Sequence, residues 1–184
     1  QHNTLRRQRQ MCIRDRRIPD VDAEHALKEG RTDLRHLPFV TIDPKTAKDF
    51  DDAVCLIEED GKRTLWVAIA DVAHYIEPET LLDDEARARA TSVYLPHAVL
   101  PMLPSRLSDN LCSLRAKVPR LAMTVSMEIE NDWTIGKVAA FESIIEVQEN
   151  LSYEDALDSP KFQNMMDLAE ELRRNEIRLS LIHI

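Results

Sequence analysis

The clearest pattern along the chain is an alternation of apolar and polar residues with a period of two, typical of half-buried β-strands. Mostly apolar runs at residues 39–42, 53–58 and 64–70 also predict strands, and the alternation itself occurs at residues 121–130 and 136–147. Asp60-Gly61 separates the second and third segments and is a common two-residue hairpin turn. Asn131-Asp132 separates the last two in the same way. The pattern therefore predicts two antiparallel hairpins.

Helical signals flank these strands. A short helical piece at residues 23–28 is stopped by Gly30, and residues 84–90 have helical character. Ser152, with Asp155 three residues later, resembles a capping box that opens a short helix. Residues 161–179 form an amphipathic pattern. Its predicted buried stripe is Phe162, Met165, Met166, Leu168, Ala169 and Leu172. Residues 96–104 are dense in proline and predict a loop. The predicted fold class is α+β, with a mixed, mainly antiparallel sheet and flanking helices.

Length and composition limit the functions that this fold can serve. The 184 residues suit one domain or part of one, and no apolar run is long enough to cross a membrane. Three glycines exclude a phosphate-binding glycine loop. A net charge of −9 taken alone argues against nucleic-acid binding. The three cysteines, Cys12, Cys55 and Cys112, lie far apart without a Cys-x-x-Cys pair, which predicts a reducing, cytoplasmic location.

The two ends of the chain differ from the rest in composition. Residues 1–17 hold six arginines and one acidic residue, and alternatives for them are a basic arm for RNA phosphates or a targeting peptide. Neither end has the pattern of a folded element, and both resemble translated adapter sequence. We therefore expect residues 1–17 to be a non-native or disordered tail, residues 18–178 to form the domain, and residues 179–184 to be non-native.

An acidic cluster between the first two predicted strands is the strongest candidate for chemistry. Asp43, Asp49, Asp51 and Asp52 fall within ten residues, and Pro44 favours a turn that lets the last three fold back toward Asp43. Like charges held within about 4 Å repel by roughly 4 kcal/mol per pair at an effective dielectric near 20. Protonation of a carboxylate or binding of Mg²⁺ would offset this repulsion. The alternative is a solvated acidic loop.

Several motifs resemble one known family in the same order along the chain. The central motif is Thr41-Ile42-Asp43, then five residues, then Asp49-Phe50-Asp51-Asp52-Ala53. Further matching motifs lie at residues 33–38, 65–72, 91–96, 100–104 and 107–114. Together they resemble the ribonuclease II / ribonuclease R family of exoribonucleases. The resemblance covers about residues 18–175, corresponds to the N-terminal half of the RNB catalytic domain, and is closer to the ribonuclease R branch.

The resemblance implies a Mg²⁺-dependent 3′→5′ exoribonuclease, with Mn²⁺ as a possible substitute, that degrades single-stranded RNA processively to nucleoside 5′-monophosphates. It assigns all four aspartates to the catalytic metal site, and we expect Asp43 and Asp52 to be direct ligands. Asp49 and Asp51 would serve a second metal, the attacking water or charge stabilisation. Tyr94 and Tyr153 match tyrosines that stack on RNA bases. The alternative for both is a half-buried core residue.

The chain also departs from the family pattern. The later Ser-Pro-Ile-Arg segment, whose arginine faces the phosphate, has no counterpart in these 184 residues. We therefore expect an incomplete, inactive fragment. A second hypothesis is a non-catalytic RNA-binding or scaffold protein on a degenerate nuclease fold. A calcium loop of the EF-hand type is excluded because its glycine and glutamate are missing. We expect a monomer without membrane association, and protein partners stay unknown.

Overall fold

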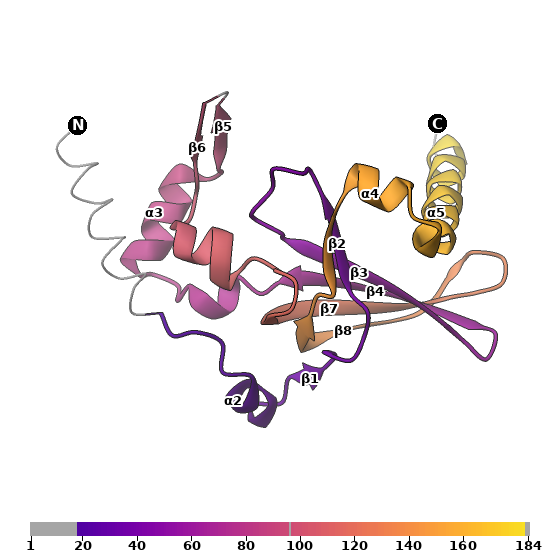
Figure 1. The fold of residues 1–184 in the computed structure, drawn as a ribbon, viewed down its shortest axis with the longest axis horizontal. Helices are drawn as coiled ribbons and strands as arrows, with labels where there is room; N and C mark the ends of the chain where they lie inside the picture. The colour runs from indigo at the N-terminus through magenta and orange to yellow at the C-terminus, as the bar shows by residue number, and fades with distance from the viewer. Residues whose placement is uncertain (1–17, 96, 183–184) are drawn as a thin grey trace.

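The computed structural model describes residues 18–95 and 97–182, so the predicted tail at residues 1–17 lies outside it. Its centre is a seven-stranded sheet with the order β1-β8-β7-β4-β3-β2-β9 (Figure 1). The strands are β1 (Thr32–Asp33), β2 (Val40–Asp43), β3 (Asp52–Glu59), β4 (Lys62–Ala70), β7 (Pro119–Ile129), β8 (Ile135–Glu146) and β9 (Glu149–Ser152). The pairs β2–β9 and β1–β8 are parallel, and the other pairs are antiparallel. The predicted α+β class with a mixed, mainly antiparallel sheet is confirmed.

Helices and short turns lie around this sheet (Figure 1). They are α2 (Ala23–Lys28), η2 (Ala73–Tyr75), α3 (Leu81–Arg89), η3 (Leu107–Leu111), α4 (Tyr153–Leu157), η4 (Pro160–Phe162) and α5 (Gln163–Ile182). The predicted capping box is present at α4, where the Ser152 and Asp155 side chains each bond the other's backbone amide. In the described part of the chain, no helix combines the length and apolar character needed to cross a membrane.

The helix predicted at residues 161–179 is divided between η4, which holds Phe162, and α5, which begins at Gln163. Phe162 and Leu168 are buried, and Met165, Met166 and Leu172 are half-buried. Ala169 is exposed, which contradicts its place in the predicted stripe. The backbone of residues 179–182 continues the helix, and the proposed domain limit at residue 178 stays a prediction.

One predicted loop is a hairpin instead. Residues 93–100 form β5 (Val93–Leu95) and β6 (Ala98–Leu100), which pair with each other in a separate two-stranded sheet. Figure 1 shows this hairpin projecting away from the seven-stranded sheet. Pro101 and Pro104 follow β6, where they remove no ladder hydrogen bond. The loop prediction for residues 96–104 was therefore wrong at Ala98–Leu100, which form β6, whereas residues 101–104 lie outside any helix or strand as predicted.

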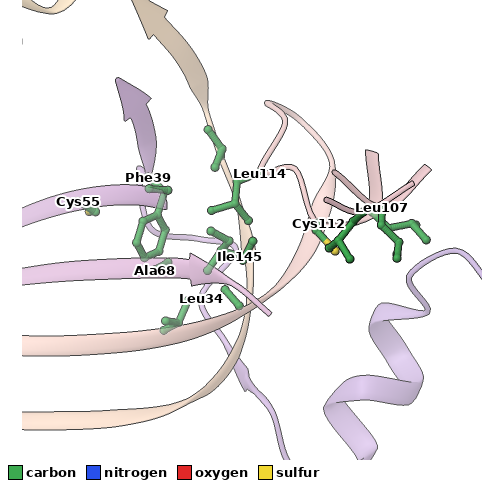
Figure 2. Close-up of a cluster of buried hydrophobic side chains, with 14 residues drawn as sticks. Leu34, Phe39, Cys55, Ala68, Leu107, Cys112, Leu114 and Ile145 are labelled. Atoms are coloured by element: carbon green, nitrogen blue, oxygen red, sulfur yellow. The ribbon is translucent and has the colours of Figure 1, made fainter. Parts of the chain in front are cut away.

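The main hydrophobic core packs residues of the sheet against segment 103–114, which includes η3. Leu107, Leu114 and Ile145 are fully buried, and Phe39, just before β2, is fully buried with them. Because segment 103–114 contributes to the core, its position against the β2–β3 loop is fixed by packing. The cluster members labelled in Figure 2 are Leu34, Phe39, Cys55, Ala68, Leu107, Cys112, Leu114 and Ile145.

Candidate active site

The four aspartates of the acidic cluster lie on β2, on β3 and on the loop between them. Asp43 is the last residue of β2, and Asp52 is the first residue of β3. Because β2 and β3 are antiparallel, the end of one and the start of the other meet at the same edge of the sheet. The predicted turn is present, since the Ala47 amide donates to the Pro44 carbonyl oxygen at 2.8 Å. Asp49 and Asp51 then follow on the returning part of the loop.

Electrostatic effects show that these carboxylates influence one another. Burial raises the pKa of Asp43, a side-chain hydrogen bond with Thr41 acts in the opposite direction, and the charges of Asp52 and Asp49 add to the increase. The pKa of Asp51 is also raised, by desolvation first and then by Asp49, Asp52 and Asp43. The fold therefore gathers negative charge at this edge and disfavours full ionisation.

The fit to a metal ion can be tested on the same residues. One carboxylate oxygen of Asp43, Oδ2, is buried and has no hydrogen-bond partner in the described part of the chain. Buried polar atoms are normally paired, so this oxygen is a candidate ligand atom. Among residues 18–95 and 97–182, however, no three His, Cys, Asp or Glu side chains are close enough to hold one ion. Mg²⁺ needs only one or two carboxylates because it keeps several waters. Asp43 with one neighbouring aspartate fits that requirement, whereas a cage of all four is not formed.

Both candidate RNA-stacking tyrosines lie beside the aspartates. Tyr94, on β5, is 65% exposed, and its hydroxyl donates to Oδ2 of Asp49 at 2.7 Å. Tyr153, the first residue of α4, is 53% exposed. It follows Ser152, which pairs with Asp43 in the parallel β2–β9 ladder. Neither ring is buried in the core, so the alternative of half-buried core residues does not apply. Each ring is accessible to a base.

Sequence reasoning missed the residues that support the aspartate loop. Ser113 is fully buried, and its side chain bonds the backbone on either side of Asp49. Asn150, on β9, bonds both Thr41 of β2 and the segment next to Ser113. Ser113 belongs to the motif at residues 107–114, which resembles the family but carries no role for this serine in the sequence alone. Nothing local in that motif indicates a contact with residues more than 60 positions away.

Comparisons with known proteins identify the family. The family model described as "RNB domain" matches residues 31–177. Ribonuclease R of Vibrio parahaemolyticus is 45% identical over 147 residues, which are 79% of this chain and 17% of that relative. A solved structure of Mycoplasma genitalium RNase R in complex with ribose-methylated single-stranded RNA superposes with a TM-score of 0.70 at 38% identity. That match covers 74% of this chain and 21% of that one.

A more distant structure shares the fold alone. Yeast Ssd1, described as a pseudonuclease, superposes with a TM-score of 0.67 at 22% identity, over 75% of this chain and 17% of that one. The chain thus spans about a fifth of the length of the proteins it matches. The match over residues 31–177 nevertheless includes every candidate site residue named above. The predicted resemblance is confirmed, and the chain belongs to the RNB domain family.

Proposed function

We propose that this chain carries part of the active site of a Mg²⁺-dependent 3′→5′ exoribonuclease that degrades single-stranded RNA processively to nucleoside 5′-monophosphates. The observation that carries the proposal is the gathering of four aspartates at one sheet edge, with an unpartnered buried oxygen on Asp43. RNA as the substrate is supported by the M. genitalium relative, whose structure contains single-stranded RNA. The buried, free cysteines Cys55 and Cys112 accord with a cytoplasmic location.

The aspartates would divide the work according to their positions. Asp43 and Asp52, on the two strands, would hold Mg²⁺ or Mn²⁺, which when bound polarises the scissile phosphate and lowers the pKa of the attacking water. Asp49 and Asp51 lie on the loop and would orient that water or a second metal ion. The exposed rings of Tyr94 and Tyr153 would stack on bases without regard to sequence.

A second candidate function is RNA binding without catalysis. The fold match to the pseudonuclease Ssd1 favours it, because the same fold occurs in a chain described as lacking nuclease function. Retention of all four aspartates favours catalysis instead, since loss of activity removes the need to keep acidic residues that repel one another. The two candidates differ in one measurable property, the release of mononucleotides.

The 184-residue chain alone is proposed to be inactive, since the phosphate-facing arginine that the family resemblance implies has no counterpart in it. An end-labelled single-stranded RNA should stay intact with this chain and be shortened to mononucleotides by a protein extended through the rest of the domain. In that extended protein, Asp51→Asn should abolish hydrolysis and keep RNA binding, because it removes charge and little volume. Asp84→Asn, on the exposed face of α3, is the matched control and should stay active. Mononucleotide release by Asp51→Asn at the parent rate would contradict the proposal.

A further inference from the structure

The loop that carries Asp49 and Asp51 is held by hydrogen bonds on both sides. Ser113 Oγ accepts a hydrogen bond from the Phe50 amide at 3.2 Å and donates to the Lys48 carbonyl oxygen at 2.8 Å. The Leu114 amide donates to the Phe50 carbonyl oxygen at 2.8 Å. On the other side, the Ala70 amide of β4 donates to the Asp51 carbonyl oxygen at 2.8 Å. The backbone is therefore fixed immediately before and after Asp49.

The same segment is connected to the strand that carries Asp43. Asn150 Nδ2 donates to Thr41 Oγ1 at 2.9 Å and to the Leu114 carbonyl oxygen at 3.0 Å. Its Oδ1 accepts a hydrogen bond from the Ala116 amide at 2.8 Å. Thr41 is fully buried and stands two residues before Asp43. Residues 113–116 thus form a bridge between the β2–β3 loop and β2, which together hold the carboxylates. Ser113 connects the bridge to the loop, and Asn150 of β9 connects it to Thr41 of β2.

The bridge is also anchored to the centre of the sheet. Arg120, a buried residue of β7, donates through Nε to the Ser113 carbonyl oxygen at 2.9 Å and through Nη2 to Asn110 Oδ1 at 3.0 Å. Leu114 is fully buried in the main core. Close packing in the core fixes the backbone of residues 113–116 in one conformation. The residues that this backbone contacts are therefore also held in fixed positions.

We propose that Ser113 and Asn150 are positioning residues that set the spacing between Asp43 and the Asp49–Asp52 loop for metal binding. The proposal rests on the proposed function, since it takes these aspartates as the metal site. Hydrogen-bonding partners of metal ligands typically change metal affinity by about 10–100-fold when they are removed. Ser113 and Asn150 act one step further back, through the backbone of the ligand-bearing segments, so we expect the lower end of that range.

The test uses the 184-residue chain and a matched pair of variants. Ser113→Ala removes the hydroxyl that bridges Lys48 and Phe50. Ser143→Ala removes an equally buried hydroxyl on β8. That hydroxyl lies 2.7 Å from Thr124 Oγ1, with which it shares a hydrogen bond, and among the described residues it makes no hydrogen bond to the aspartate loop. Amide hydrogen exchange without metal should become about tenfold faster at Phe50 in Ser113→Ala and stay unchanged there in Ser143→Ala. Paramagnetic broadening of residues 43–53 by Mn²⁺ should need about tenfold more Mn²⁺ in Ser113→Ala.

Asn150→Ala removes the hydrogen bonds between β9 and the bridge, and it provides a second test if Ser113→Ala does not fold. It should weaken Mn²⁺ binding in the same direction, with faster exchange at the Ala116 amide. Unchanged exchange at Phe50, or the same Mn²⁺ dependence in Ser113→Ala as in Ser143→Ala, would overturn the positioning role. Even broadening across surface carboxylates in the parent chain would instead contradict the proposed metal site. The exchange measurement, made without metal, keeps these two failures distinguishable.

Discussion

At the scale of single residues, the contact between Tyr94 and Asp49 gives a direct electrostatic prediction. The hydrogen bond to Asp49 raises the pKa of Tyr94, because a carboxylate acceptor stabilises the protonated phenol. Asp49→Asn should therefore lower the pKa of Tyr94 toward its ordinary value near 10, measured by NMR titration of the tyrosine ring. Asp109→Asn is the control, since Asp109 is the weakest of the contributing charges. An unaltered Tyr94 titration in Asp49→Asn would mean that the contact does not persist in solution.

The raised pKa of Asp43 predicts a stability change of definite sign. A group whose pKa is higher in the folded state contributes stability below its unfolded pKa of about 3.9, and loses it as pH rises through the folded pKa. Ionised Asp43 therefore destabilises the metal-free chain at pH 7. Asp43→Asn should raise the melting temperature in EDTA at pH 7, by about 2–4 °C per kcal/mol, and the gain should shrink toward pH 4. A variant that melts below the parent at pH 7 would contradict this assignment.

At the scale of elements, the long hairpins were predictable from the sequence. Around the β3–β4 turn, Asp60 and Gly61 adopt positive φ values of 51° and 74°, as the sequence signal for such a turn requires. Eight residue pairs from Asp52↔Ile69 to Glu59↔Lys62 then follow in register, because the two-residue turn fixes which residues of the two strands lie opposite each other. Residues 93–100 lack that signal. Their two strands have three residues each, and the large apolar side chains described on them are exposed, so no buried face imposes an alternation.

The support of the candidate site was not predictable for a different reason. The carboxylates occur together in the sequence, so a local pattern reveals them. Ser113 meets Phe50 across 63 positions, and Asn150 meets Thr41 across 109. The sequence around a serine or asparagine does not show which distant residue its side chain will bond. The parallel β2–β9 pairing that brings Asn150 to Thr41 is itself a long-range contact. Only the folded arrangement identifies these partners.

A buried ion pair connects two elements of the sheet and predicts a large effect. Arg31, just before β1, and Asp71, just after β4, are 4% and 8% exposed and meet at 2.5 Å. Asp71→Asn would leave the Arg31 charge buried without its partner, and should destabilise the chain by about 3–5 kcal/mol. Glu142 lies 3.8 Å from Arg31 and still offsets part of its charge in the variant, so we expect a loss of about 3 kcal/mol, at the lower end of that range. Urea unfolding measures the change.

The exposed pair Arg35–Asp33 is the matched comparison for that experiment. Its hydrogen bond from Arg35 lowers the pKa of Asp33 to about 2, but both side chains are about a third exposed. Solvent screening limits such pairs to about 1 kcal/mol or less, so Asp33→Asn should have a small effect on the unfolding free energy. Similar losses in Asp33→Asn and Asp71→Asn would show that the Arg31–Asp71 pair is hydrated rather than buried.

At the scale of the whole molecule, the fold and the charge distribution contribute separately to function. The fold is shared with a chain described as a pseudonuclease, so the sheet alone does not determine catalysis. The net charge of −9 attracts cations to the whole surface, with a range set by the ionic strength. A specific metal site can be distinguished from this diffuse attraction by comparing substitutions: only those at the site should abolish metal binding.

Thermal melting at constant ionic strength makes that distinction. For a dissociation constant of about 1 mM, 10 mM Mg²⁺ would stabilise the folded chain by about 1.4 kcal/mol and raise its melting temperature by about 3–6 °C. Asp43→Asn and Asp52→Asn should each lose most of this increase, because each removes a proposed ligand. Asp84→Asn lowers the net negative charge by the same amount from an exposed position on α3 and should keep the increase. If all three variants lose the increase equally, Mg²⁺ responds to net charge and the aspartates at the β2–β3 edge do not form a site. If only Asp43→Asn and Asp52→Asn lose it, the metal binds where the two strands meet.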